Sequence, residues 1–421
     1  MLIELFGRNF GPFRDEFHLS MLATDIDPGT DRGVVNVSIE GEDEPLRLLR
    51  CAAVYGPNAS GKSRLLLAAR AVGHLIERSA DFTSDDPLRP YDPFLLDEKS
   101  ATAPVMLGIR GVIGRSVYEY VIEFEKTRFV LETLTQLAPG EKRVLFERHE
   151  QSVTGPWVEE SQFALLARAF RPNAALLSLA ERLAPSLDCG LALRIRRLLG
   201  YPRLWDRPPD VSAPAARRAA RDRAGFGTFL LNWLRAADVG IQDYTVEKLP
   251  VADQPVVGTE RAPRRRRDEF KLTFAHSGLH GPVGLDYYQE SLGTLEIVEL
   301  APYIHDLIYG DELRAFFIDE IGASVHPVLL QALIRQFNCE TPPESIRGQL
   351  IFATHETLVL DAEAKSAPLR RDQVYLTEKD ATGASRLYSI AEFKERNNLN
   401  LRRRYLQGRY GALPSPGRWG E

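Results

Sequence analysis

The stretch from Gly56 to Ser63 has the pattern G-x-x-x-x-G-K-S, which is typical of loops that bind the phosphates of a nucleotide. Glycines let backbone N–H groups curl around phosphate oxygens, and a helix that starts at the loop adds partial positive charge. Lys62 can reach the β and γ phosphates, and the hydroxyl of Ser63 can bind Mg²⁺. The pattern predicts a nucleoside triphosphate site formed by Gly56, Pro57, Asn58, Ala59, Ser60, Gly61, Lys62 and Ser63.

The segments on either side of this loop have the composition that such a site requires. Residues 48–55 form a short, mostly apolar run typical of a buried strand, and apolar residues from Leu65 to Ile76 recur at helical spacing. A glycine-rich turn before a helix, with no ligand, is the alternative interpretation. The order of strand, loop and helix favours the nucleotide site.

Two acidic residues that could act on a nucleotide follow the apolar run Ala315–Ile318. If this run is a buried parallel strand, its carboxyl end brings Asp319 to Mg²⁺, and Glu320 can polarise the water that attacks the γ phosphate. A strand that ends in a solvated acidic turn would look the same. We expect the catalytic role because the same chain carries the phosphate-binding loop.

A histidine, His355, follows another apolar run, residues 348–354, which also predicts a strand. At a strand tip beside the nucleotide, a histidine can reach the γ phosphate, whereas an isolated histidine is more often structural. The order of loop, acidic strand and histidine-tipped strand favours the catalytic interpretation. We therefore predict Glu320 and His355 as catalytic residues, and Ser63 and Asp319 as ligands of Mg²⁺.

Composition indicates a globular chain with two or more packed lobes. The sequence has 421 residues, of which 44% are hydrophobic, and a net charge of −5. No apolar run approaches the length of about 20 residues that a membrane helix needs, and the N-terminus does not resemble a signal peptide. The three cysteines form no C-x-x-C pair, which argues against a disulfide framework or a structural zinc site. We expect a cytoplasmic protein without a membrane partner.

The pattern of elements divides the chain into three parts of one α/β fold. Residues 1–160 hold the phosphate loop and, after it, alternating runs that predict an antiparallel meander. Residues 161–240 predict an inserted helical lobe, in which the Pro-, Ala- and Arg-rich stretch 207–220 is expected to be a mobile excursion. Residues 241–421 return to buried strands separated by helices. We expect a mixed central sheet together with an antiparallel β-subdomain.

The segment Glu290–Leu300 begins a helix at a Ser/Gly step, Ser291 and Gly293. With this helix the chain resembles the ABC-type ATPases, whose signature motif is a Ser and a Gly at a helix N-terminus. The resemblance implies an ABC-type P-loop NTPase head that binds ATP and Mg²⁺. It also implies that Ser291 and Gly293 face the γ phosphate held by another copy, so that hydrolysis requires a head-to-tail dimer. A helix start capped by Ser291 without a ligand is the alternative.

Further residues narrow the resemblance to the RecF- and SMC-like branch, and within it to the stand-alone ATPases of abortive-infection and phage-defence systems, the AbiL and RloC-like group. They are Leu5–Phe13, Gly56–Ser63, Pro93-Phe94, Glu290–Leu300, Asp319-Glu320, His326-Pro327, Thr354-His355, Val374–Asp380, Leu387-Tyr388, Phe393-Lys394 and Tyr405–Pro414. The last stretch contains Gly408-Arg409-Tyr410-Gly411, and the types of these residues predict no catalytic role. Docking of a helix on the core explains this tail equally well.

The resemblance implies an ATP-driven sensor or switch in phage defence. ATP would close the dimer, hydrolysis would open it, and a separate effector such as a nuclease or toxin would read its state. Glu378 and Asp380 could begin a metal-dependent nuclease site within the chain. Only residues 381–421 follow, without a later D-x-D, so we expect the effector to be another protein.

DNA repair or DNA-end binding is the alternative function. A basic run from Arg261 to Arg267 could line a DNA groove across the dimer, with phosphate contacts from Arg264, Arg265, Arg266 and Arg267. A second basic cluster, Arg402–Arg404 with Arg409, could also face phosphates. A solvated loop and a solvated helix face are the alternative interpretations of these two clusters.

Overall fold

The computed structural model of the chain contains two compact units. The first comprises Met1–Leu204, Glu312–Ile321 and Gln331–Glu421, and the second comprises Trp205–Asp311 and Gly322–Leu330. The structure describes residues 1–26, 31–159, 170–183, 190–199, 214–249, 270–310, 314–338, 348–361, 369–394 and 400–415. Among the helices of these residues, none combines the length and the apolar character that crossing a membrane needs.

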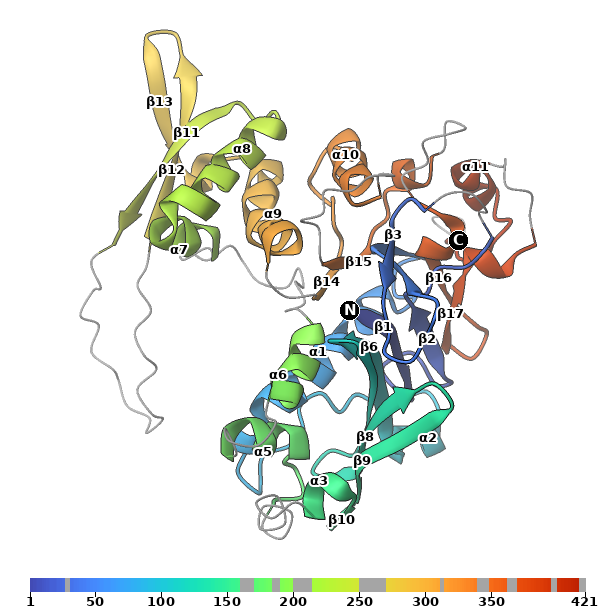
Figure 1. Ribbon diagram of the computed structural model, residues 1–421. Helices are drawn as coiled ribbons and strands as arrows, with labels where there is room; N and C mark the ends of the chain where they lie inside the picture. Colours follow the sequence, from blue (N-terminus) through green and yellow to red (C-terminus); the bar gives the residue numbers. More distant parts are fainter. Residues whose placement is uncertain are drawn as a thin grey trace. The chain divides into compact units, whose positions relative to one another are not determined.

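A five-stranded mixed sheet in the first unit contains the strands that precede the candidate site residues (Figure 1). Four of its strands are parallel, and the fifth pairs antiparallel at one edge. Strands β14, β15 and β5 are buried along their whole length, as expected for parallel strands covered on both faces. The order is β14 (Ala315–Ile318), β15 (Gln349–Ala353), β5 (Cys51–Tyr55), β16 (Val374–Lys379) and β17 (Ser385–Ser389). The predicted mixed central sheet is confirmed.

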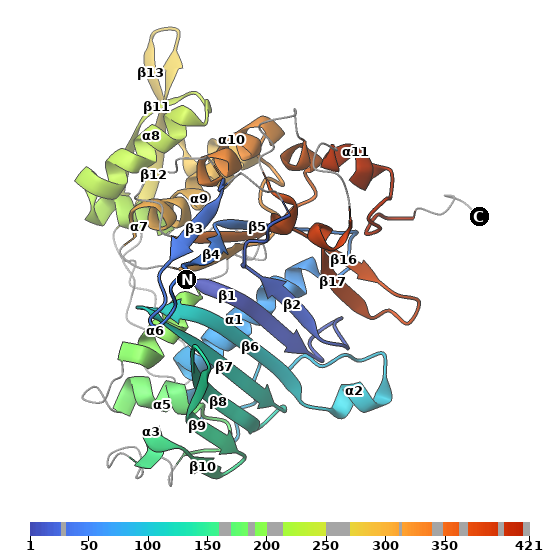
Figure 2. The same cartoon turned by 45° about the vertical axis from the view of Figure 1, so that its right-hand side comes forward.

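A second sheet of the first unit is antiparallel and has seven strands. The meander predicted after the phosphate loop forms its larger part, and the N-terminal strand β1 pairs with β6, beside which it lies in Figure 2. The order is β10 (Ser152–Thr154), β9 (Glu141–His149), β8 (Phe129–Ala138), β7 (Ser116–Phe124), β6 (Val105–Ile113), β1 (Leu2–Arg8) and β2 (Phe17–Ser20). A separate two-stranded sheet pairs β3 (Val34–Val37) with β4 (Leu46–Leu49).

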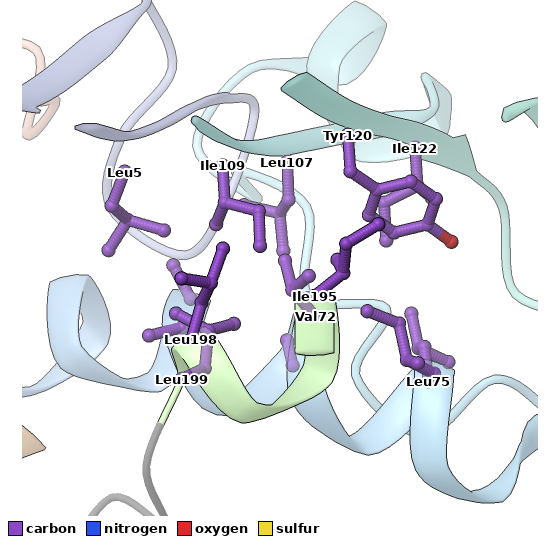
Figure 3. Close-up of a cluster of buried hydrophobic side chains, with 14 of the residues drawn as sticks. Leu5, Val72, Leu75, Leu107, Ile109, Tyr120, Ile122, Ile195, Leu198 and Leu199 are labelled. Atoms are coloured by element: carbon purple, nitrogen blue, oxygen red, sulfur yellow. The ribbon is translucent and has the colours of Figure 1, made fainter. Parts of the chain in front are cut away.

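Helix α1 (Lys62–Arg78) packs between these two sheets, because its apolar residues recur on more than one side. One core cluster joins Val72 of α1 to Leu107 of β6 and to Ile351 of β15. Figure 3 shows the antiparallel-sheet side of this cluster, where Leu107 extends from its strand toward the helices. Helices α5 (Leu176–Leu183) and α6 (Gly190–Leu198) pack against α1. The core therefore fixes the helix that begins at the phosphate loop.

A buried ion pair holds α5 against the antiparallel sheet. The side chains of Glu132 and Arg148 are both 0% exposed, and their closest N–O distance is 3.4 Å. The Glu132 carboxylate also accepts hydrogen bonds from the N–H groups of Leu176 and Leu177, at 2.8 and 3.2 Å, and from the hydroxyl of Tyr120 at 2.9 Å. Glu132 thus satisfies N–H groups at the start of α5 that have no partner within the helix. Arg148 donates in turn to the carbonyl groups of Glu150, Pro172 and Ala174.

In the second unit, helices pack on a three-stranded antiparallel sheet. Apolar residues of the helices and strands form one core cluster, which includes Phe226, Phe274 and Val298. The elements are α7 (Pro214–Arg221), the π-helical turn η2 (Arg223–Gly227), α8 (Thr228–Ala236), β11 (Ile241–Lys248), β12 (Phe270–Gly278), β13 (Gly281–Asp286), the 3₁₀ turn η3 (Tyr287–Gln289) and α9 (Leu292–Tyr309).

The helical segments of residues 161–240 are divided between the two units. Helices α5 and α6 belong to the first unit, whereas α7 and α8 belong to the second. The prediction of a mobile excursion over 207–220 is wrong from residue 214 onward. There Ala215, Ala216 and Ala219 of α7 form a stripe of small residues, and this stripe is buried in the core of the second unit.

Short elements complete the described chain. Helix α10 begins in residues of the second unit and ends in residues of the first. These elements are η1 (Ser79–Asp81), α2 (Glu98–Thr102), α3 (Pro156–Glu159), α10 (Pro327–Phe337), η4 (Thr357–Leu360), η5 (Arg371–Gln373), η6 (Ile390–Glu392) and α11 (Leu401–Leu406).

Candidate nucleotide-binding site

The phosphate-binding loop joins β5 to α1 and has a backbone that depends on its glycines. Gly56 and Gly61 have φ angles of 153° and 108°, where a residue with a side chain would be strained. A Cβ atom at Gly56 would also overlap the carbonyl and hydroxyl oxygens of Thr377. Ser63, the last residue of the pattern, is exposed, so that its hydroxyl is accessible to an ion.

Lys62 begins α1, and its side chain folds back onto the loop. Its Nζ atom donates hydrogen bonds to the carbonyl oxygens of Gly56 and Pro57, at 3.0 and 3.1 Å. Burial lowers the pKa of Lys62, and the negative charges of Asp319 and Glu320 oppose this shift. Carboxylates can do so only from nearby, so the lysine and both acidic residues share one electrostatic environment.

Asp319 lies directly after β14, at the carboxyl end of this strand. The residue is 8% exposed, and its Oδ1 atom is buried without a hydrogen-bond partner in the described part of the chain. Burying a carboxylate oxygen without a partner is costly unless a cation binds it, and carboxylates are preferred ligands of Mg²⁺. Asp319 therefore fits the role of a metal ligand.

His355 lies just beyond β15, the neighbour of β14 in the sheet. The residue is exposed at the surface, but partial desolvation of its ring lowers its pKa and the charge of Lys62 lowers it further, while Glu320 and Asp319 oppose these shifts. Because the ordinary pKa of histidine is already near 6.5, the neutral imidazole predominates at neutral pH. The structure thus brings the phosphate loop, the two acidic residues and the histidine to one edge of the sheet.

Hydrogen bonds tie the ends of β14 and β15 together. The N–H group of Ile321 donates to the carbonyl oxygen of Ala353 at 3.0 Å, and the hydroxyl of Thr354 donates to the carbonyl oxygen of Ile321 at 3.1 Å. Ile321 follows Glu320, which has a positive φ of 49°, and Thr354 precedes His355. The backbone on either side of the two predicted catalytic residues is therefore held in place.

Sequence reasoning missed Thr377, which supports the phosphate loop from β16. Its buried hydroxyl lies 2.6 Å from the hydroxyl of Ser60 and donates to the carbonyl oxygen of Tyr55 at 3.2 Å. The stretch Val374–Asp380 supported the family resemblance, and Glu378 and Asp380 suggested a nuclease site, but no role was predicted for Thr377. The available signal was the apolar run before Thr377, which resembles the run before Asp319 and predicts another residue at the carboxyl edge of the sheet.

Ser291 and Gly293 belong to the second unit, where they form the start of α9. Ser291 is the N-cap residue, and its Oγ atom accepts a hydrogen bond from the N–H group of Thr294 at 3.1 Å. Leu292 is 70% exposed although it is apolar. Gly293 is needed because a Cβ atom there would lie 2.6 Å from the carbonyl oxygen of Ser324. The helix start is thus capped by Ser291 and lies close to the segment after Ile321.

Glu296 connects α9 to this same segment. Its carboxylate is buried and accepts hydrogen bonds from the N–H groups of Gly322 and Ser324, at 3.0 and 2.9 Å. Gly322 has a positive φ of 86°, so it provides a turn that few other residues could adopt. Gly322 and Ser324 are therefore both fixed to α9.

Of the two basic clusters, the structure describes only the one in and after α11. The run from Arg261 to Arg267, with Arg264, Arg265, Arg266 and Arg267, lies outside the described residues. In α11, Arg402 forms an ion pair with Asp361 at 2.9 Å. Arg402 therefore links two parts of the chain, while Arg403 and Arg409 are exposed.

The stretch Tyr405–Pro414 near the C-terminus packs within the first unit. Tyr405 and Tyr410 are buried, and the hydroxyl of Tyr388 on β17 donates to the carbonyl oxygen of Tyr410 at 2.8 Å. Gly411 has a positive φ of 72° and lies against the carboxylate of Glu378. This packing agrees with the alternative interpretation, in which the stretch Tyr405–Pro414 docks on the core.

Hydrogen bonds engage both carboxylates of the potential nuclease pair. Asp380 accepts bonds from the N–H groups of Thr382 and Ala384, at 2.8 and 3.0 Å, and so closes the turn between β16 and β17. Glu378 accepts a bond from the hydroxyl of Tyr388 at 3.2 Å. Asp380 thus has a local structural role in the hairpin.

Comparison with known families shows which family the chain belongs to. Residues 51–361 match the family described as "AAA domain, putative AbiEii toxin, Type IV TA system", and the match spans more than half of the 421 residues. The chain belongs to this family. Membership in this AAA-domain family agrees with the resemblance to ATPases of abortive-infection systems.

Among solved structures, the AAA-domain chain is similar to the SMC head domain from Thermotoga maritima. The TM-score is 0.41 and the sequence identity 12%, over 92% of this chain and 98% of that chain. A comparison with curated proteins gave no match.

Proposed function

We propose that this member of the AAA-domain family binds ATP together with Mg²⁺ and hydrolyses it to ADP and phosphate. The proposal rests on the position of the phosphate loop, the acidic pair and the histidine, which follow the neighbouring parallel strands β5, β14 and β15. Ligands of α/β sheets bind at the carboxyl edge of such strands. The charges of the acidic pair act on both Lys62 and His355, which supports a single site.

The first step is the capture of the triphosphate by Lys62. On binding, its ammonium group would exchange the carbonyl oxygens of Gly56 and Pro57 for oxygens of the β and γ phosphates. When bound, Mg²⁺ neutralises negative charge on the phosphates, and Asp319 and Ser63 would hold this ion. The described residues contain no cluster of three His, Cys, Asp or Glu side chains that could hold a metal, which suits an ion completed by phosphate oxygens.

Glu320 and His355 would carry out the hydrolytic step. Glu320 is half-buried and acts as the general base, which takes a proton from the water that attacks the γ phosphorus. His355 donates a hydrogen bond to an oxygen of the γ phosphate as negative charge moves during bond breaking. Its lowered pKa keeps the imidazole neutral, with one N–H group to donate.

We also propose that two copies pair head to tail, with the start of α9 from one copy on the nucleotide of the other. Helix α9 has 18 residues, and its N-terminal N–H groups carry partial positive charge that favours phosphate. Ser291 and Leu292 are both exposed, which suits an interface that forms only when ATP is bound. Each ATP would then lie between Lys62 of one copy and Ser291 and Gly293 of the other.

The closed dimer would act as a switch in a defence system, and a separate effector would read its state. The family description names a toxin–antitoxin system, and because such a system has more than one component, it supports a separate partner. The effector, such as a nuclease or toxin, would respond to closing and opening of the dimer rather than to ATP itself.

The substitution Glu320→Gln tests this function. The variant should bind ATP and dimerise in light scattering, but release phosphate at least about a hundredfold more slowly, because the base is lost. Glu123→Gln is the matched control, since Glu123 forms a partly exposed ion pair with Arg8 on the antiparallel sheet. Absence of phosphate release by the unmodified chain with ATP and Mg²⁺ would refute the ATPase proposal. A variant that remains monomeric with ATP while the unmodified chain dimerises would refute the switch.

A further inference from the structure

Tyr55 connects the phosphate loop directly to the segment that carries His355. It is the last residue of β5, immediately before Gly56, and its side chain is almost completely buried. Its hydroxyl donates a hydrogen bond of 2.9 Å to the carbonyl oxygen of Glu356. Glu356 follows His355, so a single side chain joins the residue before the loop to the residue after the histidine.

The surroundings of Tyr55 hold its ring in one position. The ring packs edge-on against Tyr405 of α11, with 5.8 Å between the ring centroids and 61° between the planes. The carbonyl oxygen of Tyr55 accepts the hydroxyl of Thr377, which also contacts Ser60 of the loop. Burial raises the pKa of Tyr55 well above its ordinary value, so the hydroxyl keeps its proton and remains a donor.

The segment around Glu356 receives further support from its neighbours. Its N–H group donates to the hydroxyl of Thr354 at 3.1 Å, and its carboxylate accepts the N–H group of Leu358 at 2.7 Å. These bonds come from residues within two positions of Glu356 in the sequence. The bond from Tyr55 is different because it comes from a strand 301 residues away. It therefore fixes the segment relative to the phosphate loop.

We infer that the hydroxyl of Tyr55 is a positioning group, which sets the place of His355 relative to the phosphates held by the loop. The inference rests on the proposed ATPase function and adds a residue to it. Tyr55 does not touch the nucleotide itself, and the contacts of Lys62 and Ser60 do not involve its hydroxyl. Loss of the hydroxyl should therefore slow the hydrolytic step and leave the affinity for ATP unchanged.

The substitution Tyr55→Phe removes only this hydroxyl. We expect kcat for ATP hydrolysis to fall about five- to tenfold, the effect of one lost buried hydrogen bond, while the Kd for an ATP analogue stays within about twofold. Without nucleotide, amide hydrogen exchange in peptides that cover residues 354–358 should accelerate by a similar factor, about five- to tenfold.

Tyr375→Phe is the matched control. Tyr375 is also buried, and its hydroxyl both donates to and accepts from the backbone of Ser20, at 2.9 and 3.1 Å. Its loss should lower the melting temperature at least as much as Tyr55→Phe does, without changing kcat or the exchange of residues 354–358. Placing 4-aminophenylalanine at position 55 keeps a donor at the same point and should restore the exchange rate.

Three results would overturn the inference. They are an equal loss of kcat in both variants, weaker ATP binding at unchanged kcat in Tyr55→Phe, and unchanged exchange over residues 354–358. If the unmodified chain does not hydrolyse ATP, the proposed function fails. The exchange comparison then still decides whether Tyr55 positions the histidine segment. A Tyr55→Phe chain that does not fold while the 4-aminophenylalanine chain folds with normal exchange would support the role of the donor.

Discussion

Thr377 provides a direct test of how β16 supports the phosphate loop. The substitution Thr377→Val keeps the shape of the side chain and removes its hydroxyl. The hydroxyl makes two contacts in the structure, a hydrogen bond to the carbonyl oxygen of Tyr55 at 3.2 Å and one with the hydroxyl of Ser60 at 2.6 Å. Thr377 is fully buried, so water cannot replace these contacts without movement of the loop.

The expected magnitude follows from the two groups that lose a partner. A buried polar group left without a hydrogen bond costs about 1–3 kcal/mol. Movement of the loop would recover part of this, so we expect the free energy of unfolding to fall by about 2 kcal/mol. A displaced loop also loses its fit to the phosphates. We expect the affinity for ATP to weaken about tenfold, which corresponds to about 1.4 kcal/mol.

Urea denaturation measures the first quantity, and calorimetric titration with a non-hydrolysable ATP analogue and Mg²⁺ measures the second. Thr377→Ser is the control, because it retains the hydroxyl and loses one methyl group. This control should bind the analogue as tightly as the unmodified chain. If Thr377→Val lost stability but kept its affinity, the hydroxyl would support the fold alone, and the reasoning about the loop would be wrong.

Three further predictions concern other parts of the chain. Arg148→Met leaves the Glu132 carboxylate buried without its counter-ion and should lower the free energy of unfolding in urea by about 3–5 kcal/mol; a loss below about 1 kcal/mol would contradict this. Gly293→Ala places a Cβ atom 2.6 Å from the carbonyl oxygen of Ser324, so light scattering should detect no ATP-dependent dimer although the monomer still binds ATP. A dimer of unchanged stability would show that the helix start is not the interface. Because partial desolvation lowers the pKa of His355 below its ordinary 6.5, phosphate release should persist as the pH falls through 6.5 and decline only at lower pH. His355→Asn should remove this decline from the pH profile, and a decline centred above 6.5 would argue against the neutral imidazole.

The residues of the candidate site differ in how far the sequence could identify them. The phosphate loop is a local pattern, and Asp319, Glu320 and His355 each follow an apolar run that a parallel sheet buries. The carboxyl ends of such runs meet at one edge, so the sequence predicted their proximity. Thr377 also follows an apolar run, but this position does not by itself reveal the contact with the phosphate loop. Its role depends on Ser60, which is 317 residues away in the sequence, and no short pattern records such a contact.

The helices of the second unit could be predicted only in part, because the partners against which they pack are far away in the sequence. Helical spacing predicted a helical lobe over residues 161–240, and α5, α6, α7 and α8 lie in this range. It did not reveal that these helices belong to different units, because each amphipathic helix is compatible with many partners. The alanines of α7 were misleading, since a Pro-, Ala- and Arg-rich composition is also typical of irregular segments. The segment forms a helix because Ala215 and Ala219 are buried in the core of the second unit.

The peptide bond between Ile321 and Gly322 is one of the two places where the chain passes from the first unit into the second. On one side, Ile321 is bonded to the end of β15 and follows Glu320 directly. On the other side, the N–H group of Gly322 is bonded to Glu296 of α9. Two consecutive residues, Ile321 and Gly322, therefore connect α9 to Glu320 along the chain. If the proposed dimer forms at the start of α9, a force on this helix would act on Glu320, the proposed general base of the same chain, so that contact with the partner copy could control the timing of hydrolysis.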